Sequence, residues 1–113
     1  MSINISFNES AFSSACIHGH LNVAKYLYEI KSEINVSTSD EYVFRLACSN
    51  GHLNIAQWLY SIKPSIDISA LDEYAFKHAC KNGHLNVAKW LYEIKSSIDI
   101  YINDGYVFRE ACL

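Results

Sequence analysis

Apolar residues follow a helical period in two short neighbouring segments, and this pair of segments returns along the chain. In residues 41–50, Phe44, Ala47 and Cys48 stand at i, i+3 and i+4, which places them on one face of a helix. Residues 53–62 keep the same period, with Leu53, Ile55, Ala56, Leu59, Tyr60 and Ile62. Each unit is therefore predicted to contain two short antiparallel helices.

The unit repeats every 32 residues, a spacing marked by Gly19, Gly51 and Gly83. Such self-similarity is typical of stacked units, because one short helix pair cannot bury its apolar face alone. We predict a single domain over 1–113, all-α, built as a solenoid of stacked helix–turn–helix units. Its repeats are expected at about 8–39, 40–71 and 72–103, with a partial repeat at 104–113.

Each first helix carries a start signal and a stop signal. An Asn or Asp precedes it and is expected to cap its first turn: Asn8, Asp40, Asp72 and Asp104. Gly51 and its equivalents are expected to end it in a left-handed conformation. The connectors Ser32–Ser39, Pro64–Leu71 and Ser96–Asn103 are expected to project as fingers. In the second, Ile66 and Ile68 should point inward while Asp67 faces water.

Composition narrows the possible functions. The 113 residues are half apolar and carry a net charge of −3 with both signs mixed, which leaves no basic stripe for nucleic acid or anionic lipid. No segment approaches the ~18 apolar residues of a membrane span, and the N-terminus does not read as a secretory signal. We expect an intracellular protein that binds neither nucleic acid nor membrane.

The cysteines and histidines have two alternatives to a role in core packing: a metal site or a catalytic nucleophile. Cys16, His18 and His20 lie close together, but zinc needs four ligands and the next unit lies ~8–10 Å away. We therefore predict no metal or cofactor, and buried reduced thiols at Cys16, Cys48, Cys80 and Cys112. A histidine recurs after each glycine, where it is expected to hydrogen-bond the backbone of the turn: His20, His52 and His84. No catalytic pattern is present, so no enzymatic activity is expected.

The segment Ala47-Cys48-Ser49-Asn50-Gly51-His52-Leu53 resembles the Ala-Ala-x-x-Gly-His-Leu of ankyrin repeats, and its counterparts extend the resemblance over almost the whole chain. The family's Thr-Pro-Leu-His is replaced by Tyr42-Val43-Phe44-Arg45. The longer pattern Phe-Arg-x-Ala-Cys-x-Asn-Gly-His-Leu-Asn-x-Ala-x-Trp-Leu-Tyr is similar to the divergent ankyrin sets of giant DNA viruses, and this likeness would place the protein in the host cytoplasm. The resemblance implies a protein–protein interaction module. The alternatives are a structural fragment of a larger repeat protein without its own partner and, by analogy only, a ubiquitin-ligase substrate adaptor.

Positions that differ between units, on the first helix and at the finger tips, predict the binding face. These partner-binding candidates are Arg45, Leu46, Ser49, Leu71, Lys77, His78, Lys81, Tyr101 and Ile102, with Arg45 and Tyr101 as anchors. Variation at unconstrained positions is the alternative, and His78 is equally an exposed bystander. Tyr26, Trp58 and Trp90 are expected to pack as an aromatic ladder, or else to form a second binding surface. We expect a monomer, with dimerisation through the 104–113 end as the alternative.

Overall fold

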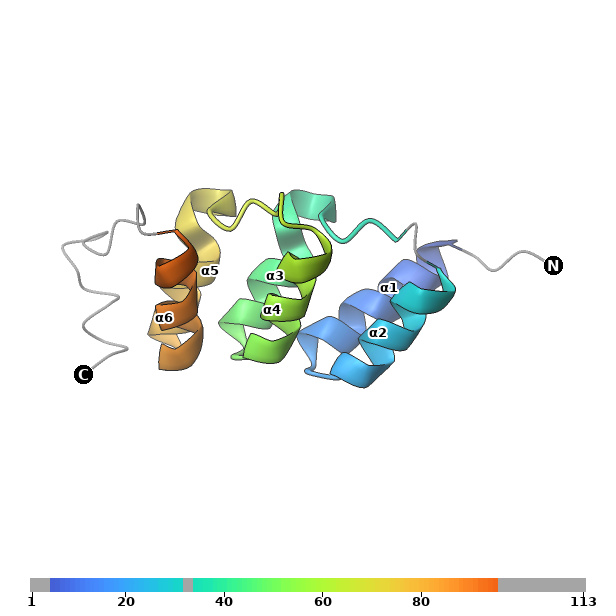
Figure 1. Ribbon diagram of the computed structural model, residues 1–113, viewed down its shortest axis with the longest axis horizontal. Helices are drawn as coiled ribbons and strands as arrows, with labels where there is room; N and C mark the ends of the chain where they lie inside the picture. Colours follow the sequence, from blue (N-terminus) through green and yellow to red (C-terminus); the bar gives the residue numbers. More distant parts are fainter. Residues whose placement is uncertain (1–4, 32–33, 96–113) are drawn as a thin grey trace.

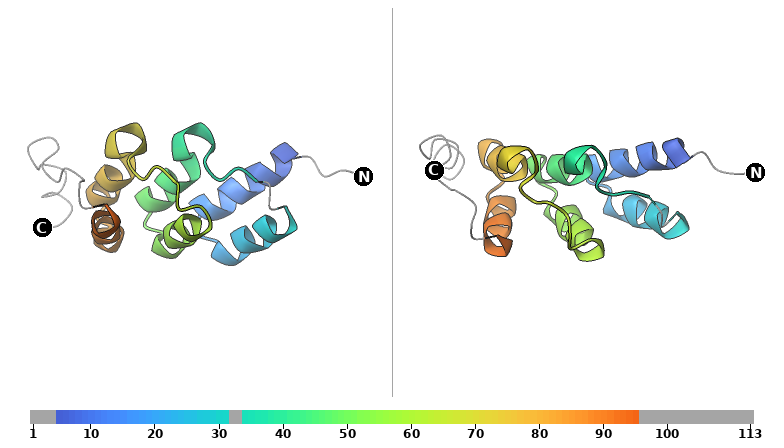
Figure 2. Two further views of the ribbon diagram at one scale, coloured as in Figure 1. Left: turned by 45° about the horizontal axis from the view of Figure 1, so that its top comes forward. Right: turned by 90° about the horizontal axis from the view of Figure 1, so that it is seen from above.

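The computed structural model describes residues 5–31 and 34–95. They contain six α-helices and no β-strand. The helices are α1 (Ile5–Ile17), α2 (Leu21–Ile30), α3 (Thr38–Ser49), α4 (Leu53–Ile62), α5 (Ala70–Lys81) and α6 (Leu85–Ile94). Figures 1 and 2 show three helix pairs stacked side by side, with α1, α3 and α5 in one row and α2, α4 and α6 in the other. The predicted all-α solenoid is confirmed.

A left-handed glycine ends each first helix, as predicted. Gly51 has φ +83°, and Gly19 and Gly83 have +86° and +81°. In the second unit the amide of His52 donates to the carbonyl of Ala47 at 2.9 Å, and the amide of Gly51 donates to Cys48 at 3.1 Å. These two bonds satisfy carbonyls at the helix end and reverse the chain into α4.

The helix starts differ from the prediction that Asp40 and Asp72 act as N-caps. Asp40 lies inside α3, in a left-handed turn formed by Ser39, Asp40 and Glu41 with φ between +55° and +63°. Asp72 lies in the equivalent turn of α5, and its carboxylate accepts from Lys77 at 3.2 Å. The right-handed helix therefore begins after these turns. Asn8 lies within α1 rather than ahead of it, and Asp104 lies outside the described residues.

The core includes the predicted repeating positions, together with others such as Val43 and Ala75. Phe44, Ala47 and Cys48 are fully buried, as are their equivalents Phe12, Cys16, Ala79 and Cys80 to within a few per cent. In the finger, Ile66 and Ile68 are buried while Asp67 is exposed, which confirms the expected alternation. The third finger, 96–103, and the partial repeat lie beyond the described residues.

Side-chain amides couple neighbouring units. The Nδ2 of Asn50 donates to the carbonyl of Ile17 at 3.1 Å, and that of Asn82 donates to Ser49 at 2.9 Å. Ile17 and Ser49 are the last residues of α1 and α3, where carbonyls lack a partner within the helix. Each amide therefore caps the helix of the preceding unit.

Tryptophans couple the units on the second-helix side. The ring of Trp58 makes an edge contact with Tyr28 at 5.8 Å and lies 6.0 Å from Phe12, measured between centroids. Trp90 repeats this with Tyr60 at 5.9 Å and Phe44 at 6.2 Å. The predicted packing role of Trp58 and Trp90 is confirmed, but the ladder is wrong: each ring packs on a Phe and a Tyr of the preceding unit. Tyr26 stands in the first unit and is 61% exposed.

Candidate functional site

The structure divides the predicted partner-binding residues by exposure. Leu71 is 52% exposed and Lys81 is also exposed, while Leu46, Lys77 and His78 are half-buried. Arg45 and Ser49 are buried, with exposed fractions of 8% and 7%. Tyr101 and Ile102 lie outside the described residues.

Arg45 faces inward because its guanidinium contacts both the left-handed turn and the next unit. Its Nε donates to the carbonyl of Asp40 at 2.8 Å, and its Nη2 donates to that of Ser39 at 3.2 Å. The guanidinium also lies 4.7 Å from the ring centroid of Tyr74, a cation–π distance. The expectation that Arg45 faces outward is therefore wrong. A helical wheel of α3 alone does not include Tyr74 of the following unit.

Ser49 is buried for a related reason. Its hydroxyl oxygen lies 3.2 Å from the Nδ2 of Asn82, which also binds the Ser49 carbonyl. The hydroxyl and the carbonyl of Ser49 thus both take part in the junction between the second and third units.

Tyr74 and His78 lie among the cationic side chains of α5. The two rings stack with centroids 3.9 Å apart and planes inclined by 29°. Burial lowers the pKa of His78, and the charges of Lys81, Lys77 and Arg45 lower it further. His78 is therefore favoured in its neutral form beside Lys77 and Lys81. Tyr74, which sequence reasoning missed, contacts both Arg45 and His78; its recurrence as Tyr42 and Tyr106 was the available signal.

Two features place Leu71 at the surface. It lies in the left-handed turn at the start of α5, with φ +55°, and the following Asp72 pairs with Lys77. Leu71 therefore forms an exposed apolar tip next to the Asp72–Lys77 ion pair. Positive φ is unfavourable for a residue other than glycine, so contacts around the turn hold Leu71 in this conformation.

The recurring histidines lie at unit junctions. The imidazole of His52 lies against Gly19 of the preceding unit, and burial lowers its pKa. His52 thus contacts the preceding unit, and the predicted hydrogen bond to the backbone of its own turn stays a prediction.

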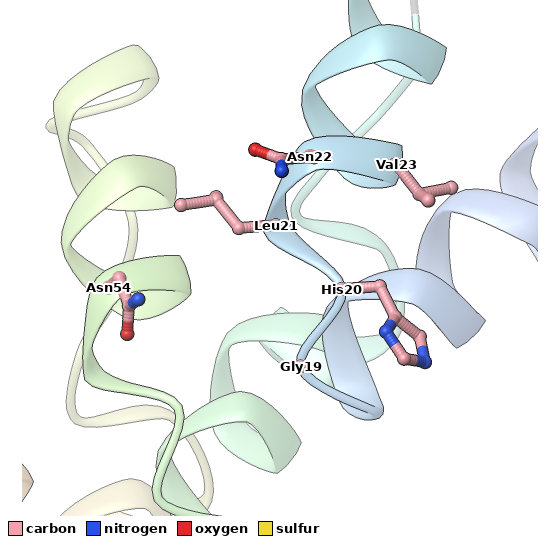
Figure 3. A pocket seen from close by; sticks show the side chains of 6 residues that line it. All are labelled: Gly19, His20, Leu21, Asn22, Val23 and Asn54. Atoms are coloured by element: carbon pink, nitrogen blue, oxygen red, sulfur yellow. The ribbon is translucent and has the colours of Figure 1, made fainter.

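A shallow open hollow of about 460 Å³ lies between the starts of α2 and α4. Figure 3 shows Leu21 directed toward the helix that carries Asn54, while the His20 ring points away from the hollow. Its lining combines a glycine, a histidine, two amide and two aliphatic residues: Gly19, His20, Leu21, Asn22, Val23 and Asn54. This lining offers hydrogen bonds and apolar contact but no pair of groups arranged for acid–base chemistry.

Cys16 and Cys48 are buried free thiols, Cys80 is buried as well, and burial raises the pKa of Cys16 to about 12. Within the described ranges, no three His, Cys, Asp or Glu side chains come close enough together to hold a metal ion. The same residues include no helix long and apolar enough to cross a membrane.

Comparison with known proteins agrees with this geometry. Residues 13–104 match the family model described as ankyrin repeats (3 copies). No curated protein and no solved structure gives a significant match. Because the family match covers most of the chain and the helix pairs stack as described, the chain belongs to the ankyrin-repeat family.

Proposed function

We propose that the chain is a non-catalytic module that binds another protein through its first-helix row and finger tips. Ankyrin repeats are generally protein–protein interaction modules, so membership of the family supports this class of function. The observation that carries the proposed location is Leu71, a large apolar side chain that is 52% exposed in the left-handed turn that begins α5. Exposed apolar groups beside polar ones are typical of binding surfaces.

The proposed contact set is Leu71 with Lys77, His78 and Lys81 of α5. This combination fits a partner that offers an apolar side chain next to a carboxylate. Arg45 and Ser49 support the face from beneath, since their polar groups are used within the chain. Leu46 is half-buried at the edge of this face. The proposal includes Tyr101 and Ile102 of the next finger on the basis of the sequence alone.

The finer identity also belongs to this proposal. The likeness to the repeats of giant DNA viruses, residence in the cytoplasm of a host cell and a substrate-adaptor role rest on resemblance. The competing function is a repeat fragment without a partner of its own.

Affinity capture with matched variants tests the proposal. The face variant is Leu71→Ser with Lys81→Glu, and the control is Gln57→Glu with Lys89→Glu on the second-helix row, where both residues are exposed. The proposal expects a protein captured by the wild type and the control, and lost with the face variant. Equal capture by all three proteins would contradict this binding face, and recovery of chaperones alone would favour the fragment.

A further inference from the structure

The two left-handed turns share one backbone conformation but are held by different side chains. Ser39–Glu41 in α3 and Leu71–Glu73 in α5 all have φ between +55° and +63°. Three successive residues other than glycine are unfavourable in this conformation, so each turn needs contacts that hold it. In α3, Arg45 donates to two carbonyls of the turn. In α5, Lys77 stands at the equivalent position and binds the carboxylate of Asp72 instead.

Lys95, at the end of α6, closes the turn of α5. Its Nζ donates to the Oγ of Ser69 and lies 3.7 Å from the Oε2 of Glu73. Ser69 immediately precedes α5 and Glu73 is the last residue of the turn, so the two contacts bracket Leu71. Figure 1 shows the end of α6 beside the start of α5, in the same helix pair. We call the contacts of Lys95 with Ser69 and Glu73 the Lys95 clasp.

The carboxylate of Glu73 depends on this ammonium. The Glu73 side chain is 15% exposed, and its second oxygen, Oε1, is buried without a hydrogen-bond partner among the described residues. A carboxylate removed from water is unfavourable unless a cation or hydrogen bonds compensate it, and Lys95 is the cation that pairs with Glu73. Removal of the ammonium should therefore release Glu73 and, with it, the turn.

The second unit does not form such a clasp. Its equivalent residues are Ser37, Glu41 and Lys63. The Ser37 hydroxyl is buried without a hydrogen-bond partner in the part of the chain that the structure describes, and Glu41 accepts from the amide of Asp67 at 3.0 Å. The clasp thus accompanies the turn that exposes a large apolar side chain, whereas Arg45 holds the turn of α3.

We propose that Lys95 is a positioning residue of the partner-binding face: the clasp holds Leu71 in the left-handed conformation in which the partner binds it. Lys95 has this role only if Leu71 contacts a partner, so the proposal rests on the proposed function. Lys95 is half-buried and acts through Ser69 and Glu73. A partner that binds only the clasped turn loses affinity in proportion to the fraction of molecules in which the turn is open.

NMR of the isotope-labelled full chain tests whether Lys95 holds the turn. Lys95→Met keeps the aliphatic stem and removes the ammonium, Lys95→Arg keeps a cationic donor, and Lys63→Met is the matched control in the second unit. The intraresidue NOE between the amide proton and Hα is strong at positive φ. For Leu71 this strong NOE should be lost in Lys95→Met and kept in Lys95→Arg and Lys63→Met. For Ser39, in the turn held by Arg45, it should stay unchanged in all three, which separates release of one turn from unfolding.

A second variant makes this result independent of whether Lys95→Met folds. Ser69→Ala removes one of the two contacts of the Lys95 clasp and should weaken the Leu71 NOE in the same direction. Circular dichroism shows which variants are folded. An unchanged Leu71 NOE in either folded variant would overturn the proposal.

Affinity capture then links the turn to binding. Lys95→Met should capture the wild type's partner ~10-fold less, as expected if about one molecule in ten keeps the clasped turn, and Lys95→Arg should stay within ~2-fold of the wild type. Full capture by Lys95→Met despite loss of the Leu71 NOE would overturn the positioning role. So would an equal loss in Lys63→Met, which would indicate a general effect of removing a lysine from a helix end. If the wild type captures no protein, the proposed function fails, and the Leu71 NOE still decides whether Lys95 holds the turn.

Discussion

The imidazole of His52 lies against the backbone of Gly19 in the preceding unit, so closely that a Cβ on Gly19 would come within 2.7 Å of the His52 Cε1. His84 and Gly51 repeat this relationship, with 2.5 Å between such a Cβ and the His84 Nδ1. The glycine therefore provides both the left-handed turn of its own unit and the space for the next unit's histidine.

Gly51→Ala should destabilise the protein more than Gly83→Ala. Both glycines have similar positive φ, which costs an alanine ~1–2 kcal/mol, but among the described residues nothing lies within 4 Å of a Cβ on Gly83. Displacement of His84 should add ~1–3 kcal/mol to the Gly51 variant. Urea unfolding measures both losses, and equal losses would show that the contact with His84 has no energetic weight.

Arg45→Ala should reduce the free energy of unfolding by ~2 kcal/mol or more. It removes two hydrogen bonds from a charged donor and a cation–π contact with Tyr74. Lys77→Ala at the equivalent position removes one surface ion pair, worth ~0–1 kcal/mol. Thermal and urea unfolding compare the two variants; an Arg45→Ala protein as stable as Lys77→Ala would contradict the inferred role of the guanidinium.

Much of the fold could be predicted because its signals are local and repeated. The 32-residue period, the glycine after each first helix and the Phe44–Cys48 stripe all follow from backbone conformation and helical geometry. The burial of Ile66 and Ile68 follows from alternation.

The errors arise where a neighbouring unit or a special turn decides the outcome. Asp40 looked like a helix cap, but the chain enters α3 through a left-handed turn held by Arg45. Arg45 looked variable and hence exposed, although Tyr74 of the next unit covers it. Trp58 was expected to contact its own equivalents, whereas the offset between stacked units brings it to Phe12 and Tyr28.

The stability of the fold should fall as the pH drops below ~6.5. The folded state lowers the pKa of both His52 and His78 from 6.5, mainly by burial. As the pH falls through ~6.5, the unfolded chain takes up protons at these histidines before the folded chain does, which favours unfolding. The stability that these two histidines contribute is fully present above pH ~6.5 and is lost as the pH falls toward their folded-state pKa values.

Urea midpoints measured from ~pH 8 to ~pH 5 test this pH dependence. The variant His52→Gln with His78→Leu should show a flatter acid limb, since Leu stands at the equivalent position 46. Proton NMR follows the His52 ring directly, and a midpoint at or above 6.5 in the folded protein would contradict the inference.

Native thiol reactivity should be low. Cys16, Cys48 and Cys80 are 0% exposed, and burial raises the pKa of Cys16 to about 12, which suppresses its reactive thiolate. In a Cys112→Ser variant, the three remaining thiols should react with a thiol reagent only as the protein unfolds. Rapid labelling of any of them under native conditions would contradict their burial.

Photo-crosslinking from single positions tests the central claim, the partner-binding face, most directly. A photoreactive residue at Leu71, exposed in the left-handed turn that begins α5, is compared with one at Gln57, exposed on the second-helix row. The account predicts that the Leu71 probe forms an adduct with a distinct protein in the source cell, that Lys81→Glu in the same chain reduces this adduct, and that the Gln57 probe does not form it. The same adduct from Gln57 with none from Leu71 would contradict the proposed face.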